Sequence, residues 1–254
     1  EQARACGCAA EHAGRAGDVP AAVVVLGVHG VAEAAGHIDA QHARVVVRAA
    51  AGPGVLGQLG LSVELLRREC PRLVICSLNG YGEQSPLQQA VGHDLNYLAM
   101  NGVLAGTGTL DHAVAPWPPL ADCAASLFGL STILGALLGR ERSGNGCHVA
   151  VALADSVMPL MVFSLAKLGL TGTGMPRAED LLNGGAARYR TYRTADGHSV
   201  ALGAVEPKFW QAFCHAAGRV DWIARMDDPL PQTDLQQELV EFFAALTLHQ
   251  CNER

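Results

Sequence analysis

The sequence is poor in charged and aromatic residues. Of its 254 residues, 17% are charged and 5% are aromatic, and the formal net charge is −6. A general nucleic-acid binder carries a basic face that neutralises phosphates, so this charge argues against nucleic acid as a partner. No charged-then-apolar leader opens the chain, and no apolar run reaches membrane-spanning length without a glycine or polar interruption. We therefore expect no membrane partner.

Cysteine pairs with metal-binding or redox spacing are also missing. The chain has eight cysteines but no CxxC motif, and Cys6-x-Cys8 has no second ligand pair nearby. Several cysteines lie inside apolar runs such as "RLVICSL", where a reduced cysteine behaves as a small hydrophobe. We expect reduced thiols, no metal and an intracellular protein.

What the sequence does contain is an alternation of strand and helix patterns. Runs typical of buried parallel strands occupy residues 21–28, 43–49 and 72–78, and residues 61–70 have helical spacing. A long helix is predicted over 121–142, ended by "SGNG". This order predicts an α/β fold with a large Rossmann-like, mainly parallel sheet.

The later chain predicts a second, smaller domain. A helix is expected over 154–169, with Pro159 tolerated near its start. A Gly/Pro-rich connector follows, and then a β-hairpin around "ADG" and a helix over 206–218. The expected domains are a large α/β domain, a linker and a small α+β domain, at 20–170, 171–186 and 187–254.

Three ionisable residues stand at the starts of predicted elements rather than on solvated faces. They are His93 in "AVGHDLNYLAMNG", Asp122 in "PPLADCAASLFG" and Glu206 before Pro207. Taken alone, Asp122 and Glu206 are best explained by capping or a first-turn dipole interaction, and His93 by a cap or a satisfied buried histidine. A catalytic role is favoured only if something ties the three together.

The tie is a family resemblance carried by five blocks in the same order. The blocks are "GHDLNYLAMNGVL", "PPLADCAASLFG", "RSGNGCHVAVALADS", "LLNGGAARYRTYRTADG" and "VALGAVEPKFW". Together they resemble the α-methylacyl-CoA racemases, which belong to the wider class III CoA-transferase (CaiB/BaiF) family. The match runs from about Val45 to about Gly218. It implies that the large domain binds CoA, with an atypical N-terminal part and a chain truncated at both ends.

The resemblance implies roles for individual residues. His93 and Asp122 would be the two acid/base groups, and Glu206 would partner the histidine. A segment would line the pantetheine and thioester of an acyl-CoA substrate: Gly92, Asp94, Leu95, Asn96 and Tyr97. No cofactor is implied, because coenzyme A is part of the substrate. Family members form interlocked dimers, so Glu206 would reach His93 from the other subunit. The compartment would be the cytoplasm in a bacterium, or the peroxisome or mitochondrion in a eukaryote.

Elementary chemistry agrees with these roles. Inverting a carbon next to a thioester requires removal of a weakly acidic α-proton and its return to the opposite face, so two bases must face each other across that carbon. Histidine titrates near neutrality, and a shielded aspartate gains proton affinity. A backbone N–H at a helix start, such as that of Asp94, would hold the enolate oxygen. Met100, Met158 and Met161 could line a flexible acyl pocket, but core positions at helical spacing are favoured.

Two alternatives stay open. Class III transferases use the aspartate matching Asp122 as a nucleophile, but they usually lack the histidine and the glutamate, so racemase is favoured. The chain could instead be an inactive or truncated relative. The family's "RPGV", "LDGG" and "PLNL" become "GPGV", "LNGG" and "WPPL" here, which places Gly52, Asn183 and Pro118 at the changed positions.

Overall fold

The computed structural model describes residues 22–26, 43–49 and 61–253. The chain forms two compact units, Glu1–Ala90 with Ser126–Ala152 and Val91–Ala125 with Leu153–Arg254. The expectations for residues 1–20, for Gly52 and for Cys6 and Cys8 lie outside the described residues. Each unit is described here by itself.

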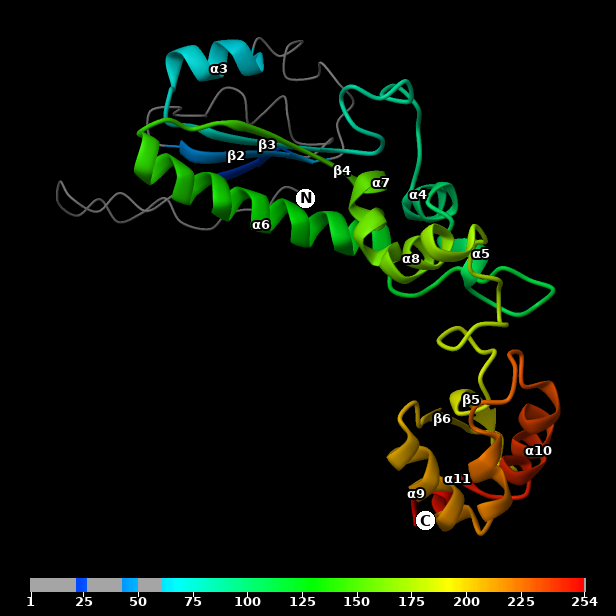
Figure 1. Cartoon of the computed structure of the whole chain (residues 1–254). Helices are drawn as coiled ribbons and strands as arrows, with labels where there is room; N and C mark the ends of the chain where they lie inside the picture. Colours follow the sequence, from blue (N-terminus) through cyan, green and yellow to red (C-terminus); the bar gives the residue numbers. More distant parts are fainter. Residues whose placement is uncertain (1–21, 27–42, 50–60, 254) are drawn as a thin grey trace, which may run out of the picture. The chain divides into compact units, whose positions relative to one another are not determined.

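The first unit is built on a parallel four-stranded sheet in the order β1-β2-β3-β4 (Figure 1). The strands are β1 (Ala22–Leu26), β2 (Ala43–Ala49), β3 (Val74–Asn79) and β4 (His148–Ala152). Ile75 of β3 pairs with Val46 on one side and His148 on the other. The β-branched runs therefore became parallel strands as predicted, because buried parallel strands need continuous apolar sequence.

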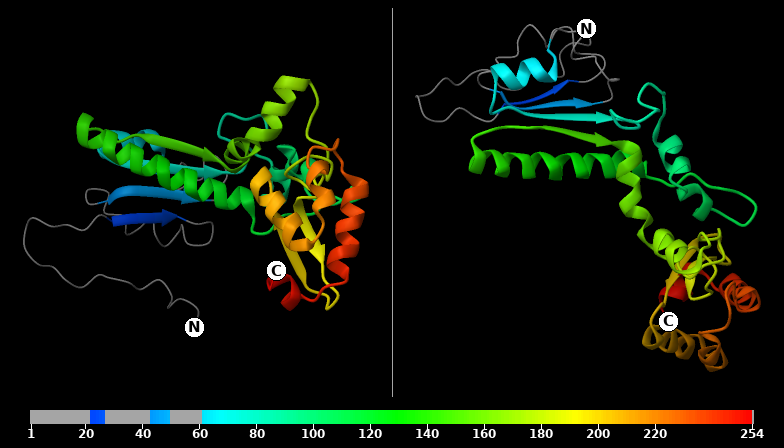
Figure 2. Two further views of the ribbon diagram at one scale, coloured as in Figure 1. Left: turned by 60° about the horizontal axis from the view of Figure 1, so that its bottom comes forward. Right: turned by 45° about the horizontal axis from the view of Figure 1, so that its top comes forward.

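Two helices flank this sheet on opposite faces (Figures 1 and 2). They are α3 (Val63–Glu69) and the part of α6 (Leu120–Ser143) that begins at Ser126. The hydroxyl of Ser62 caps α3 by accepting a hydrogen bond from the Leu65 N–H at 3.2 Å. Gly129 of α6 lies close to the Leu78 side chain, where a Cβ would make ordinary contact at 3.6 Å.

One glycine is required where the chain enters β4. A Cβ at Gly146 would lie 2.0 Å from the carbonyl oxygen of Leu73. The Gly146 N–H also donates to the Pro71 carbonyl at 2.8 Å, so the two backbones run in close contact. Only glycine lets the chain pass here.

The second unit begins with a group of short helices. They are α4 (Asp94–Met100), α5 (Val103–Gly106), α7 (Leu153–Val157) and α8 (Val162–Thr171), with a 3₁₀ turn, η1 (Met158–Met161), between the last two. The side chain of Asn101 joins α4 to α7, since its Nδ2 donates to the carbonyls of Tyr97 and Ala154, both at 2.9 Å.

Two expectations for this region were wrong. The helix predicted over 154–169 is interrupted at η1, because Pro159 has no N–H to donate and its ring disfavours a continuous α-helix. Met100 and Met158 are 53% and 43% exposed, so they are not core residues. Their thioether side chains lie on the surface of the second unit.

In the part of the chain that the structure describes, two stretches are long and apolar enough to cross a membrane by length and composition alone, Leu120–Ser143 and Leu153–Thr171. Only 22% and 17% of these two windows are buried, so neither stretch is an enclosed core helix of the described chain. The first stretch contains three glycines and several polar residues, and the second is interrupted by η1. Composition therefore does not make either a membrane span.

The C-terminal part of the second unit has its own core. A hairpin of β5 (Tyr189–Arg193) and β6 (Ser199–Gly203) is followed by α9 (Pro207–Ala217), η2 (Val220–Arg225), α10 (Thr233–Ala244) and α11 (Leu248–Asn252). The predicted hairpin and helix 206–218 are therefore confirmed. The core residues are large and apolar: Tyr192, Trp210, Cys214, Trp222, Leu235, Leu239 and Phe243.

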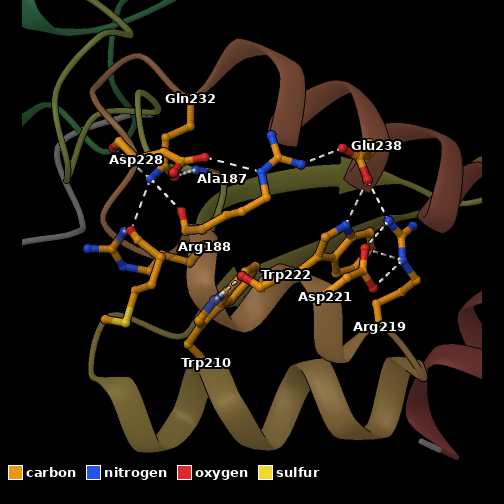
Figure 3. A network of polar contacts seen from close by, with 11 residues as sticks. Ala187, Arg188, Trp210, Arg219, Asp221, Trp222, Asp228, Gln232 and Glu238 are labelled. Atoms are coloured by element: carbon orange, nitrogen blue, oxygen red, sulfur yellow. Dashed lines mark hydrogen bonds and ion pairs between the residues drawn. The ribbon is translucent and has the colours of Figure 1, made fainter.

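A polar network lies beside this core (Figure 3). Glu238 of α10 accepts a hydrogen bond from the Trp222 indole N–H at 2.9 Å and forms ion pairs with Arg219 and Arg225. These donors lower the pKa of Glu238 to about 2. Gln232 accepts from the Ala187 N–H at 3.0 Å and donates to nearby carbonyls, so it fastens the start of the hairpin to the helices.

Candidate active site

His93 is the N-cap residue of α4. Its backbone is extended, and its N–H donates to the side-chain oxygen of Asn96 at 3.0 Å. Asn96 therefore supplies the N3 half of a capping box, in which the side chain of the third helical residue accepts from the N-cap N–H. His93 is exposed at the helix start.

The residue after His93 joins two helices. The carboxylate oxygen Oδ1 of Asp94 accepts hydrogen bonds from the backbone N–H groups of Ala121 at 2.7 Å and Asp122 at 3.2 Å. These N–H groups belong to the first turn of α6, where no intrahelical acceptor exists. The start of α4 and the start of α6 therefore lie together, and His93 is brought close to Asp122.

The electrostatics of Asp122 agree with this closeness. The pKa of Asp122 is raised, first because surrounding protein atoms displace water and second because Asp94 is negatively charged. The charge of His93 acts in the opposite direction and lowers it. Asp122 remains exposed to solvent at the same time. The site thus combines an accessible carboxyl of increased proton affinity with a nearby imidazole.

The segment expected to line the thioester surrounds this pair. Tyr97 is buried, and its hydroxyl donates to the Gly92 carbonyl at 2.7 Å, which holds the turn that leads into α4. Leu95 and Asn96 are exposed. Asp94 is the first residue of α4, so its own N–H has no intrahelical acceptor. Contact of these residues with an acyl-CoA stays a prediction.

Glu206 belongs to the later part of the second unit, after the β5-β6 hairpin in the chain. It is the N-cap residue of α9, directly before Pro207, and its side chain makes no capping hydrogen bond. In the part of the chain that the structure describes, no hydrogen bond or ion pair joins Glu206 to His93. The structure therefore brings together His93 and Asp122, and it does not bring Glu206 to them within one chain.

Asn183, which replaces the family's aspartate, is used as a hydrogen-bond donor. Its Nδ2 donates to the Pro176 carbonyl at 2.6 Å, and its Oδ1 accepts from the Asp180 N–H at 2.8 Å. A carboxylate could not make the first of these bonds. The substitution is therefore compatible with a well-ordered connector.

The sequence did not reveal the role of the Asp94 side chain. Its contact with Ala121 spans 27 residues of chain, and no local pattern predicts such a contact. The sequence did indicate the general place, because a His-Asp pair follows Gly92 where a loop is predicted to become an apolar helix.

Chemically, the arrangement can remove and return a proton. A carboxyl and an imidazole that lie close together, one with raised proton affinity, form an acid/base pair. Among the residues 61–253, no group of three or more His, Cys, Asp or Glu side chains is placed to hold a metal ion. The six cysteines in the described part of the chain are free thiols.

Comparison with known proteins identifies relatives of two activities. The chain is 38% identical over 169 residues to the human alpha-methylacyl-CoA racemase and 36% identical over 171 residues to that of Mus musculus. Each match covers 65% of this chain and 44% of the relative, so the chain spans less than half of their length. It is also 30% identical over 149 residues to the succinyl-CoA:glutarate CoA-transferase of Mus musculus, covering 58% of this chain and 34% of that protein.

Solved structures agree with the fold. The structure of Rv3272 from Mycobacterium tuberculosis matches with a TM-score of 0.68 and 29% identity, covering 84% of this chain and 58% of that chain. A CaiB/BaiF family protein from Brucella suis matches with the same TM-score at 22% identity, covering 84% and 58%. The predicted fold class is thereby confirmed. Since the family model for CoA-transferase family III matches residues 40–254, the chain belongs to that family.

Proposed function

We propose that this protein interconverts the two enantiomers of 2-methylacyl-CoA thioesters by proton transfer at the α-carbon. The observation that carries the proposal is the junction of α4 and α6, where the Asp94 carboxylate holds His93 and Asp122 side by side. The sequence likeness to two racemases supports the same activity. Because the chain spans only part of those relatives, the activity is proposed for the whole protein.

The proposed reaction uses the two side chains in turn. One base removes the α-proton from one enantiomer, which leaves an enolate, and the conjugate acid of the other base returns a proton to the opposite face. For one direction Asp122 acts as carboxylate and His93 as imidazolium; for the other direction the roles are exchanged. The raised pKa of Asp122 assists, because a carboxylate that binds a proton more readily is a stronger base.

The developing negative charge on the thioester oxygen needs a donor. We assign this task to the N–H of Asp94 at the first position of α4. The partial positive charge of the helix N-terminus favours a negatively charged oxygen there. Hydrogen bonds of this kind contribute about 3 kcal/mol to transition-state stabilisation in other enzymes. The exposed Met100 and Met158 side chains are suited to contact an acyl chain of variable shape.

Glu206 completes the proposed site from a second copy of the chain. Its carboxylate would orient the His93 ring and stabilise the imidazolium, but within one chain no hydrogen bond of the described residues joins the two. The helices α6 and α8 leave apolar side chains exposed, which supports a large interface with another subunit. The proposed assembly is therefore a homodimer.

The direct test is deuterium uptake at C2 of a 2-methylacyl-CoA in heavy water, followed by mass spectrometry. We expect uptake from either enantiomer and a loss of about 100-fold or more in His93→Ala and in Asp122→Ala. His112→Ala, which changes an exposed histidine outside the site, is the matched control and should retain the wild-type rate. Unchanged uptake in His93→Ala would exclude the proposed mechanism.

A second candidate is CoA transfer, which the likeness to a succinyl-CoA:glutarate CoA-transferase favours. Asp122 would then attack the thioester carbonyl, and the aspartyl anhydride and thioester intermediates would be trapped by hydroxylamine or borohydride. Incubation with an acyl-CoA and the trap, followed by peptide mass spectrometry, distinguishes the two reactions. A modified Asp122 together with no C2 exchange would replace the racemase proposal by the transferase.

A further inference from the structure

The Asp94 carboxylate has no acid or base role in the proposed reaction, yet it is the most constrained polar group at the site. Its Oδ1 accepts from the N–H groups of both Ala121 and Asp122, at 2.7 and 3.2 Å. Asp94 therefore acts as the cap of α6, although it is 27 residues away from Ala121 and belongs to another helix.

The same residue is covalently tied to the other base. Asp94 directly follows His93, and the His93 backbone is itself held by Asn96 at 3.0 Å. The imidazole thus belongs to a hydrogen-bonded turn, and the neighbouring Asp94 carboxylate accepts a hydrogen bond from the Asp122 N–H. The two acid/base groups are positioned relative to one another through a single side chain.

We propose that Asp94 is the positioning residue of this site: through the cap it fixes the start of α6, and with it Asp122, relative to His93. The catalytic part of this inference, that His93 and Asp122 are the two bases, rests on the proposed function. The structural part, in which Asp94 couples α4 to the first turn of α6, stands on the hydrogen bonds alone.

The charges around Asp122 fit this proposal. The charges that shift the pKa of Asp122 come from Asp94, the first residue of α4, and from His93, the N-cap of that helix. Desolvation raises the pKa of Asp122 most, the negative charge of Asp94 raises it further, and His93 lowers it. Removal of the Asp94 charge alone should therefore lower the pKa of Asp122, since a like charge no longer opposes ionisation.

Two substitutions separate the cap from the charge. Asp94→Asn keeps a side-chain oxygen of the same geometry as an acceptor but removes the charge, and asparagine is as good a cap as aspartate. Asp94→Ala removes both the acceptor and the charge. A variant that matches wild type in structure and differs only in charge is thus available, with a second that loses the cap as well.

The first measurement does not depend on turnover. In protein labelled with ¹³C at the aspartate carboxyls, the Asp122 resonance is assigned from its loss in Asp122→Asn and followed as a function of pH. We expect the midpoint for Asp122 to move to lower pH in Asp94→Asn. An unchanged midpoint would overturn the electrostatic part of the inference.

The second measurement tests the cap. Amide hydrogen exchange of Ala121 and Asp122 should accelerate in Asp94→Ala and stay close to wild type in Asp94→Asn. Equal exchange in all three proteins would overturn the positioning role. Both measurements use the intact 254-residue chain.

The third measurement is C2 deuterium uptake as a function of pH. It is made with the enantiomer whose α-proton Asp122 removes. For that enantiomer the Asp122 carboxyl must be ionised to accept the proton, so the rate falls as pH drops through the pKa of Asp122, and in Asp94→Asn this acid limb should move to lower pH. Asp94→Ala should lose about 10- to 100-fold in rate, because the bases are no longer held in register. If wild type shows no C2 exchange while the Asp122 midpoint still moves, the racemase proposal is wrong and the coupling of Asp94 to Asp122 is supported.

Discussion

Two regions of the molecule differ in the exposure of their large apolar side chains. One is residues 187–253, and the other is the pair of helices α6 and α8. Residues 187–253 enclose their largest side chains: Trp210, Trp222, Leu235 and Leu239 are fully buried in one cluster. The helices α6 and α8 instead leave large apolar side chains in contact with solvent: Leu127, Leu130, Leu134, Leu138, Phe163, Leu168 and Leu170.

The difference indicates which region is complete by itself. A closed aromatic core and a polar network that satisfies its own donors and acceptors are the properties of an independently stable fold. Contiguous exposed apolar faces on helices are the properties of an interface. The C-terminal region should thus fold without help, whereas the α6 and α8 helices need another surface to cover them.

The largest expected difference is between fragments of the two regions produced separately. We expect a fragment of residues 187–254 to unfold cooperatively and to give a near-ultraviolet circular dichroism signal from its packed tryptophans. A fragment of residues 61–170 should bind a hydrophobic dye and aggregate, because its apolar helix faces stay uncovered. A dye-binding 187–254 fragment without near-ultraviolet signal would reverse the comparison.

Truncating one buried and one exposed side chain sharpens the comparison. Trp222→Ala should lower the free energy of unfolding by about 3–5 kcal/mol, since it removes a fully buried ring that contacts Trp210 and Phe242. Leu134→Ala, at a half-exposed position of α6, should change it by no more than about 0.5 kcal/mol in a monomeric protein. Urea denaturation measures both, and a similar cost at the two positions would contradict the assignment of an independent core.

A charged side chain introduced on the exposed face of α6 tests whether a second copy of the chain covers that face. Leu130→Glu should weaken association of two copies by about 1–3 kcal/mol and reduce C2 exchange in parallel, because Glu206 is proposed to act across the interface. Analytical ultracentrifugation measures the association. Val240→Glu places the same charge on an exposed position of α10 and is the control. Unaltered association in Leu130→Glu would remove this face from the proposed dimer.

The smallest expected change in the free energy of unfolding comes from the polar network of the C-terminal region. Hydrogen bonds from Trp222, Arg219 and Arg225 lower the pKa of Glu238 from 4.5 to about 2. A depressed pKa stabilises the folded state fully above the unfolded value and loses that contribution as pH falls from 4.5 towards about 2.

We therefore expect Glu238→Gln to cost about 1 kcal/mol at pH 7, a value reduced for solvent screening because the side chain is 35% exposed. The difference from wild type should shrink below pH 3. Glu241→Gln changes an exposed acid on the same helix and should have almost no effect at either pH. A difference that persists unchanged at pH 2 would show that the ion pairs are not its source.

Much of the fold could be predicted because it depends on local patterns. The predicted helix 121–142 is Leu120–Ser143, and the predicted strand at 72–78 is Val74–Asn79. Apolar periodicity and glycine stops act over a few residues, so they are visible in one sequence. The exposure of Met100 and Met158 was not visible, since helical spacing alone does not say what, if anything, covers a face.

The candidate site was only partly predictable for the same reason. His93, Asp122 and Glu206 were singled out at element starts, and the structure places the first two together. The contact that does so is made by Asp94, whose partners are a helix turn far along the chain. Long-range contacts of one side chain depend on tertiary packing, and no periodicity encodes them.

The cap formed by Asp94 also has a consequence for how such a site can change during evolution. Residues 107–119 connect α5 to α6 and are largely exposed, with a local turn in which the Thr109 N–H donates to the His112 carbonyl at 3.0 Å. Since the start of α6 is fixed by a hydrogen-bonded side chain and not by the length of this connection, residues can be inserted or deleted near the turn at little entropic cost. Related proteins are free to vary this loop, and with it the surface that it presents, while the spacing of the two bases stays the same.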